Sequence, residues 1–93
     1  MLEEHFPLEV EGKRRDRLVL FSAMLSRADR GVNKTELMYK VGMSTAQLDK
    51  YIPVLVRSNL LEVLNHSKRC VYKTTEKGRD FLEAFGRLVQ LVY

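Results

Sequence analysis

Apolar residues recur at helical spacing along most of the chain, beginning near residue 13. The first such stretch predicts a helix from Lys13 to about Asp29. Its apolar face consists of Leu18, Phe21, Met24, Leu25 and Ala28. The preceding residues, MLEEHFPLEVEG, show no clean period and contain Pro7 and Gly12, which is typical of irregular chain. We therefore expect an irregular acidic segment over residues 1–12 and one folded domain over residues 13–93.

Two helix-start signals lie close together after this first helix. Asn33 with Glu36, and Ser44 with Gln47, each fit a capping box. In this motif the first side chain accepts a hydrogen bond from a free amide of the first turn, and the second side chain bonds back to the cap. Each pair therefore predicts a helix that begins directly after its first member.

A stop signal separates the two predicted helices. Gly42 directly follows the periodic residues Leu37, Met38 and Val41, and glycine readily takes the left-handed conformation that commonly ends a helix. The first helix should end near Val41, and the second should begin about three residues later. Two short helices joined by such a turn form the helix-turn-helix pattern, whose second helix enters the major groove of DNA.

The second helix of this pair has distinct apolar and polar faces. The apolar stripe consists of Leu48, Tyr51, Ile52, Leu55 and Val56. The outward positions are Thr45, Ala46, Gln47, Asp49, Lys50, Pro53 and Arg57. The first four of these are small or can hydrogen-bond to base edges. Pro53 should bend the helix after Ile52, which confines base reading to Ser44 through Lys50. Any helical hairpin of a small domain can share these features, so the pair alone does not decide for DNA binding.

The next stretch predicts a β-hairpin with a basic tip. Leu60 to Leu64 and Cys70 to Lys73 are two β-prone runs on either side of a polar segment that contains Lys68 and Arg69. A hairpin that follows a helix-turn-helix pair is the wing of a winged helix, and a basic tip lies where a wing meets phosphates. The hairpin therefore favours DNA binding more strongly than the helix pair does alone.

The last predicted helix runs from Glu76 to Val92 and carries more apolar residues than one packing seam requires. Its start is marked by Thr75 as a cap and by the acid of Glu76 in the first turn. The residues that we expect at an interface between two copies are Phe81, Phe85, Leu88, Val89 and Val92. One edge of the stripe can pack on its own domain and the other on a partner chain, although both edges can also be buried in a monomer core.

The order of these elements predicts a mainly α fold with a small β-hairpin (α+β). Helix, helix pair, hairpin and helix is the winged helix-turn-helix arrangement. A chain of 93 residues suits one domain with little core to spare, and a dimer would relieve that shortage.

The distribution of charge is more informative than the formal net charge of +4. Residues 1–12 hold four acids and no Lys or Arg, so residues 13–93 carry 16 basic and 8 acidic groups, a net of +8. This favours a polyanionic partner, nucleic acid before an acidic membrane. A need for solubility alone can also produce such a charge.

Catalytic and metal-binding signals are weak. His66 and Cys70 stand four apart across the hairpin, but a structural zinc site normally takes four ligands. The sequence has no Gly-rich phosphate loop and no nucleophile–base grouping with supporting context, so we expect no enzyme, cofactor, metal or small-molecule ligand. It also has no apolar run of about 18 residues and no signal segment, and we expect a soluble cytoplasmic protein associated with the nucleoid.

Two stretches of the sequence resemble a known family. KTELMYKVGMSTAQLDKYIPVLVRSNLLE and the later VYKTTEKGRDFLEAF are similar to small archaeal winged-helix DNA-binding proteins, a family of predicted transcriptional regulators and chromatin-type proteins. The resemblance covers roughly Lys13 to Phe85, and its motif Thr75 to Gly78 is shared with many winged-helix regulators. It implies a homodimer held by the C-terminal helices, residues 76–92, and binding to double-stranded DNA.

These observations define a set of expected contacts. The DNA-binding residues are Ser44, Thr45, Ala46, Gln47 and Lys50 in the major groove, Arg57 near flanking phosphates, Lys68 and Arg69 on the wing, and Lys34 and Lys40 on the preceding helix. The alternative is a winged-helix protein-interaction module of a multi-subunit assembly, in which the basic residues are incidental. RNA binding shares the charge argument, but the chain lacks the aromatic platform that single-strand readers use.

Overall fold

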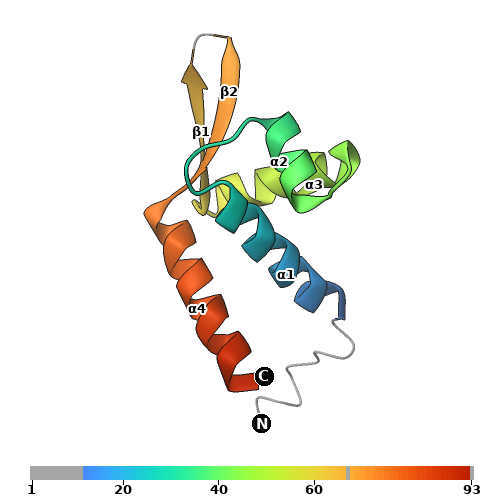
Figure 1. Cartoon of the computed structure of the whole chain (residues 1–93), viewed down its shortest axis with the longest axis vertical. Helices are drawn as coiled ribbons and strands as arrows, with labels where there is room; N and C mark the ends of the chain where they lie inside the picture. The colour runs from blue at the N-terminus through green and yellow to red at the C-terminus, as the bar shows by residue number, and fades with distance from the viewer. Residues whose placement is uncertain (1–11, 67, 93) are drawn as a thin grey trace.

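The structure, a computed structural model, describes residues 12–66 and 68–92, and the side chains from Arg17 onward except that of His66. The predicted irregular segment, residues 1–12, lies outside the described residues apart from Gly12, the first residue of a helix. The described elements are α1 (Gly12–Arg27), α2 (Lys34–Val41), α3 (Thr45–Arg57), β1 (Leu61–His66), β2 (Arg69–Thr74) and α4 (Glu76–Val92) (Figure 1). This is the predicted winged helix-turn-helix order.

Both capping boxes form as the sequence predicts. The Asn33 side chain accepts from the Glu36 amide at 2.8 Å, and the Asn33 amide donates to the Glu36 carboxylate at 3.1 Å. Ser44 and Gln47 repeat the exchange at 3.2 and 3.1 Å. Gly42 ends α2 in the left-handed conformation, with φ of 70°. Local hydrogen bonds therefore define the turn, which leaves only three residues, 42–44, between the end of α2 and the start of α3.

The structure changes the predicted bounds of the first helix and of both strands. α1 ends at Arg27 and not near Asp29, because the chain reverses at Gly31, whose φ is 94°, and the Ala28 carbonyl accepts from the amides of Gly31 and Thr74. The strands run over Leu61–His66 and Arg69–Thr74, where the sequence predicted Leu60 to Leu64 and Cys70 to Lys73. The antiparallel register continues from the pair Leu61 and Thr74 at the base to the pair His66 and Arg69 at the tip. α3 continues through Pro53 as a single helix.

The core lies between α1, the helix pair and the base of the hairpin. Its largest fully buried side chains are Met24, Leu25, Leu37, Leu48, Leu55, Leu61 and Thr74. Thr74 is the polar member of this group, and its hydroxyl donates to the Leu25 carbonyl in the last turn of α1 at 2.6 Å. That bond satisfies a carbonyl at a helix end, where intrahelical donors run out.

The wing is attached to the rest of the domain along β2. Val32 forms an isolated antiparallel bridge with Tyr72, with hydrogen bonds of 2.9 and 2.7 Å between their backbones. This short extended piece before α2 acts as a third strand of one residue. The hairpin is consequently held at its base, while its tip projects away from the helices (Figure 1).

α4 begins against the chain segment that leaves α3. The Thr75 hydroxyl donates to the Asn59 carbonyl at 2.6 Å, and the Lys77 ammonium donates to the Ser58 carbonyl at 3.0 Å. The Thr75 amide also donates to the Leu60 carbonyl at 3.1 Å. α4 then runs antiparallel to α1, away from the wing (Figure 1). Within the described residues, none of the helices is long and apolar enough to cross a membrane.

Candidate nucleic-acid interface

α3 presents one face to the core and the other to solvent. Leu48, Ile52 and Leu55 are buried, and Tyr51 and Val56 pack against the core from its edge, as predicted. All seven predicted outward positions of α3 are exposed. The exposed face extends from Thr45 to Arg57, a length of about 18 Å at 1.5 Å per residue.

Three of the predicted reading residues make local hydrogen bonds at the start of α3. Ser44 and Gln47 bond to each other's backbone in the capping box. The Thr45 hydroxyl donates to the Met38 sulfur of α2 at 3.3 Å. The carboxamide nitrogen of Gln47 is not used by the box, which takes only the carbonyl oxygen of that side chain. Gln47 therefore has two donors left for a base edge or a phosphate.

An acidic residue of the exposed face is paired with a basic residue of α2. Asp49 accepts a hydrogen bond from the ammonium of Lys34 in a salt bridge between α3 and α2. The pair offsets the charge of a carboxylate that would otherwise face a polyanion. Lys34, expected to contact the DNA backbone, is thus placed beside the start of α3, but its charge is shared with Asp49.

The remaining predicted residues of α3 lie along its exposed length. Ala46 and Lys50 belong to the first two turns, and the Lys50 ammonium sits 5.4 Å from the centre of the Tyr51 ring. Arg57 occupies the last turn of the helix. Lys50 therefore places a positive charge in the second turn of the exposed face, and Arg57 places one in the last turn. The residues of the first turn are uncharged.

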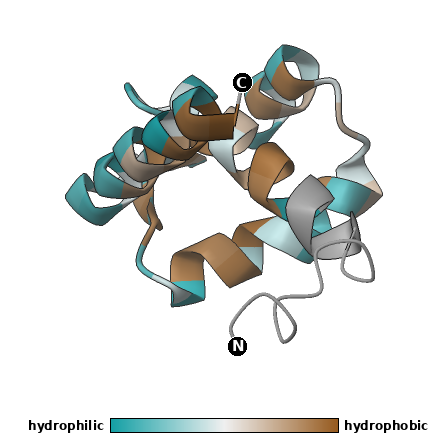
Figure 2. Ribbon diagram, turned by 90° about the horizontal axis from the view of Figure 1, so that it is seen from below, coloured by the Kyte–Doolittle hydropathy of each residue, from teal (hydrophilic) through white to brown (hydrophobic). Residues whose placement is uncertain are grey.

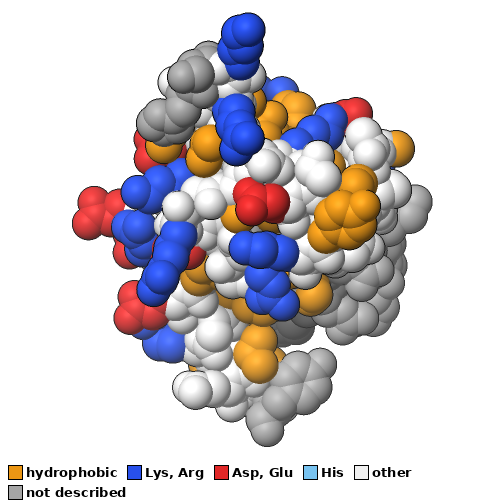
Figure 3. Space-filling model, turned by 45° about the horizontal axis from the view of Figure 1, so that its top comes forward, with side chains coloured by type: hydrophobic (Ala, Val, Ile, Leu, Met, Phe, Trp, Pro, Cys, Tyr) orange, Lys and Arg blue, Asp and Glu red, His pale blue; other side chains and the backbone are white. Residues whose placement is uncertain are grey.

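The predicted wing contacts, Lys68 and Arg69, are exposed at the tip of the hairpin. Figure 3 shows Lys and Arg side chains at the tip and along the side of the molecule below it. Burial raises the pKa of the Tyr72 phenol above its ordinary value, and a hydrogen bond with Cys70 adds to the shift. A tyrosine with an ordinary pKa is already uncharged at physiological pH, and the upward shift does not change this, so Tyr72 does not reduce the positive charge of the hairpin.

Lys40 lies apart from Lys34, at the opposite end of α2. It shares an open cavity with Arg27 and Arg30, at the end of α1. Arg27 and Arg30 were not among the predicted contacts, because the sequence places them only at a helix end and in a turn. The spacing of either residue along the chain gives no sign that it lines a cavity together with Lys40.

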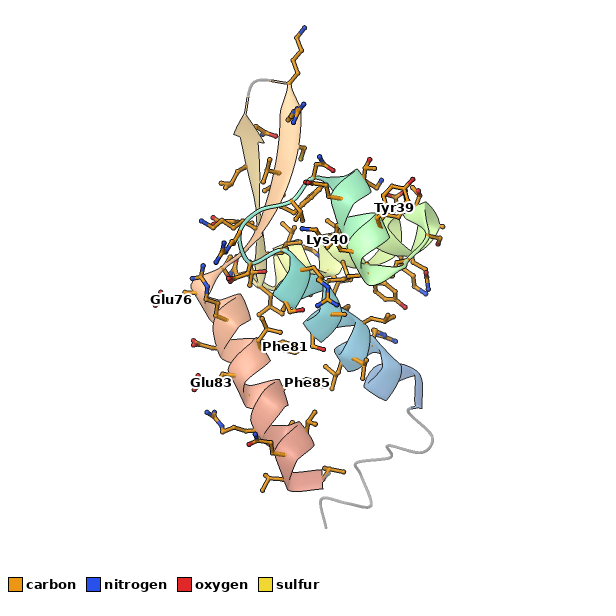
Figure 4. All side chains as sticks on the ribbon, in the orientation of Figure 1. Tyr39, Lys40, Glu76, Phe81, Glu83 and Phe85 are labelled. Atoms are coloured by element: carbon orange, nitrogen blue, oxygen red, sulfur yellow. The ribbon has the colours of Figure 1, made fainter. Side chains whose placement is uncertain are left out.

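The five predicted interface residues of α4 divide into two groups. Phe81 and Phe85 are partly buried, with ring centres 6.2 Å apart, and point from α4 toward α1 (Figure 4). Leu88, Val89 and Val92 are exposed, together with Leu91, which is 83% exposed and was not predicted. The hydrophobic last turn stands beside the C-terminus in Figure 2. Leu18 and Val19 of α1 are also exposed.

The two residues considered as metal ligands in the sequence, His66 and Cys70, lie on different strands of the hairpin. His66 stands opposite Arg69 in the register, and Cys70 stands opposite Asn65. Among the described residues, no three His, Cys, Asp or Glu side chains come together as potential metal ligands.

Comparison with known proteins agrees with the observed fold. The sequence profile of the winged helix-turn-helix family matches residues 14–92. No curated protein matches the sequence significantly. Among solved structures, the chain is similar to Sso10a-2, a DNA-binding protein from Sulfolobus solfataricus, with 20% identity and a TM-score of 0.73 over 80% of this chain and 78% of that one.

A second similar structure belongs to an enzyme. It is human N-acetylserotonin methyltransferase in complex with SAM, with 15% identity and a TM-score of 0.56. The match covers 86% of this chain but only 25% of the methyltransferase. At these identities, both similarities show a shared fold and nothing further.

Proposed function

Because the chain belongs to the winged helix-turn-helix family, we propose that it binds double-stranded DNA, with α3 in the major groove and the hairpin as the wing. The observation that carries this proposal is the exposed polar face of α3 in a domain that also projects a basic hairpin tip. The fold that the chain shares with Sso10a-2, itself a DNA-binding protein, agrees with the proposal.

The residues divide into those that read bases and those that hold the backbone. Thr45, Ala46 and Gln47 are small or carry hydrogen-bonding groups on the first turn of α3, which is the part of a recognition helix that meets base edges. Lys50 and Arg57 lie further along the same face and suit phosphates. Ser44 contributes mainly as the cap that fixes the direction of the first turn.

The wing supplies contacts that do not depend on base sequence. Lys68 and Arg69 are exposed at the tip, where a wing can contact the phosphate backbone or the minor groove beside the recognition helix. Lys34 and Lys40 add positive charge on α2, although the carboxylate of Asp49 offsets part of the charge of Lys34. The protein is then suited to regulate transcription from chromosomal DNA or to package it.

We further propose that two copies associate through α4. The last two turns of this helix expose Leu88, Val89, Leu91 and Val92, and α1 exposes Leu18 and Val19. A second copy presents the same exposed apolar residues, so a twofold axis can bury those of the two copies against each other without a separate partner. α4 is about 25 Å long, which suits a compact interface.

The wing provides the test of DNA binding. Duplex DNA of random sequence should bind with an affinity that falls as salt rises, and the double substitution Lys68→Ala and Arg69→Ala should lower the slope of log affinity against log salt by roughly two, about one for each phosphate contact. Fluorescence anisotropy of a labelled duplex measures this slope. An unchanged slope with weaker binding removes the wing from the proposed contacts.

A matched control separates the wing from net charge. Arg87→Ala removes one positive charge from α4, where Arg87 pairs with Glu83 at 3.3 Å, so it is compared with each wing substitution made singly, and it should leave the slope close to that of the parent protein. If the folded protein binds no duplex even at low salt, the proposal fails. The exposed apolar end of α4 then favours the other candidate function, a protein-interaction module in a larger assembly.

A further inference from the structure

An open cavity of about 480 Å³ lies between the end of α1, the loop after it and the last turn of α2. Its polar lining consists of Ser26, Arg27, Asp29, Arg30 and Lys40. Figure 4 shows Lys40 at this junction, whereas Tyr39 projects on the far side of α2. The cavity is formed by segments on both sides of the Gly31 reversal, so it exists only in the folded chain.

The charge of the lining is strongly positive. Arg27, Arg30 and Lys40 contribute three cations, against the single carboxylate of Asp29. Asp29 is already paired, since its Oδ1 accepts from Nε of Arg79 at 2.9 Å. Among the side chains that the structure describes, no carboxylate lies within 4.0 Å of the three lining cations. The lining therefore has a surplus of positive charge that its own acids do not offset.

The available donors match an oxyanion with several oxygens. Nη1 of Arg27 donates to the Ser26 hydroxyl at 3.2 Å, which leaves the other guanidinium donors of Arg27 available. Arg30 and Lys40 are exposed and add further donors. Two guanidinium forks and an ammonium suit phosphate, because a guanidinium can bind two phosphate oxygens at once.

The backbone adds little to such a site. The Gly31 amide donates to the Ala28 carbonyl at 3.0 Å, and the Val32 amide donates to the Tyr72 carbonyl at 2.9 Å. The negative end of the α1 dipole also opposes an anion in this position. Binding must therefore depend on the three side-chain cations, and an anion with more than one negative charge has an advantage.

We propose that this cavity binds a phosphate group, presented either by the DNA backbone or by a small phosphorylated molecule. The first source rests on the proposed DNA binding, and the second does not. The volume is within the range of small-molecule sites and admits a group as large as a pyrophosphate. The two sources share one chemistry at the cavity, so one probe tests the site and a second identifies the source.

Pyrophosphate is the first probe. It is titrated into the ¹⁵N-labelled full chain at constant ionic strength, and the amide resonances of Gly31 and Val32 should shift along a saturable curve. Arg30→Gln should weaken this binding at least fivefold, and Lys40→Gln provides a second exposed variant with the same expected effect. Arg87→Gln is the matched control, with the same change of charge on α4, and should bind within twofold of the parent. The proposal is overturned if the shifts do not saturate, or if Arg30→Gln and Arg87→Gln weaken binding equally.

Duplex DNA is the second probe. If the DNA backbone occupies the cavity, the duplex should displace pyrophosphate, and Arg30→Gln should lower the salt slope of duplex binding by about one. If a small phosphorylated molecule is the natural occupant, pyrophosphate should stay bound in the presence of duplex and Arg30→Gln should bind duplex like the parent protein. Either result supports a phosphate site. A chain that binds no duplex leaves the pyrophosphate result standing, so the two proposals fail separately.

Discussion

Gln47 carries two tasks at the scale of the single residue. Its carbonyl oxygen accepts the Ser44 amide and completes the cap of α3, while its two amide donors remain on the exposed face. The capping task is structural, and the proposed reading task depends on those donors. Truncation to Ala would remove both, so a different substitution is needed to separate them.

We expect Gln47→Glu to separate stability from DNA binding. Glu at this position can keep the capping box and suits the positive end of the helix dipole, so the free energy of unfolding should change by no more than about 0.5 kcal/mol. A carboxylate has no donors and repels phosphates, so duplex affinity at low salt should fall about tenfold, or roughly 1.4 kcal/mol. Urea unfolding and duplex anisotropy measure the two effects.

Gln90→Glu is the control for this substitution, because Gln90 is an exposed residue of α4. It introduces the same charge on the same overall fold and should leave duplex affinity within about twofold. Equal loss of affinity in both variants would mean that net charge, and not the first turn of α3, controls binding.

At the scale of the element, the start of α4 is tied to the end of α3. A Cβ on Gly78 would lie 2.4 Å from the Leu60 carbonyl oxygen and 2.5 Å from Cγ2 of Thr74. The absence of a side chain at Gly78 is what lets the helix approach the backbone so closely. Thr75 and Lys77 then bond to the Asn59 and Ser58 carbonyls. Thr75, Lys77 and Gly78 of this motif therefore hold the start of α4 against the backbone that follows α3.

Gly78→Ala should destabilise the protein by about 2 kcal/mol or more, because a backbone carbonyl cannot move aside as a flexible side chain can. Gly86→Ala is the matched control on the same helix, since a Cβ there meets nothing within 4 Å. It should be neutral or stabilising by about 0.5–1 kcal/mol, the usual gain from replacing a helical glycine. The midpoint and slope of urea unfolding check both values, and equal destabilisation would contradict the close approach at Gly78.

At the scale of the whole molecule, the described residues have two different ends. One end carries α3 and the hairpin, and the other carries the exposed apolar residues at the end of α4. α1 and α4 extend from the first end to the second (Figure 1). Leu91 and Val92 are 83% and 71% exposed, and no described element of the chain covers them. A dimer built on α4 would leave both copies of α3 open to solvent, which would permit contacts with two half-sites.

Leu91→Glu should raise the dissociation constant of the proposed dimer at least tenfold, because a carboxylate at a closed apolar interface loses its hydration. Tyr39→Glu is the control, since Tyr39 is a large exposed residue of α2, 78% exposed, away from α4. Sedimentation equilibrium of both variants and the parent measures the association. A parent protein that is monomeric at high micromolar concentration rules out the dimer, and an apolar partner of another sequence then becomes the candidate for this surface.

Much of the fold was predictable because its signals are local. Asn33 with Glu36 and Ser44 with Gln47 exchange hydrogen bonds over three residues, and the helix bounds at Lys34, Glu76 and Val92 follow from such caps and from apolar spacing. The boundaries that were predicted less well are those that distant parts of the chain decide. α1 stops at Arg27 where the Ala28 carbonyl turns to the Thr74 amide, which belongs to the far end of the hairpin in sequence.

The sequence by itself determined the order of the elements, their caps, the buried face of α3 and the exposure of the wing tip, because each depends on hydrogen bonds or periodicity within a few neighbouring residues. Only the tertiary structure decided that Lys34 pairs with Asp49, that Gly78 meets the Leu60 carbonyl, and that Lys40 joins Arg27 and Arg30 around one cavity. Each of these arrangements involves residues of different elements. Spacing along the chain describes the faces of a helix, but which faces meet is decided by packing.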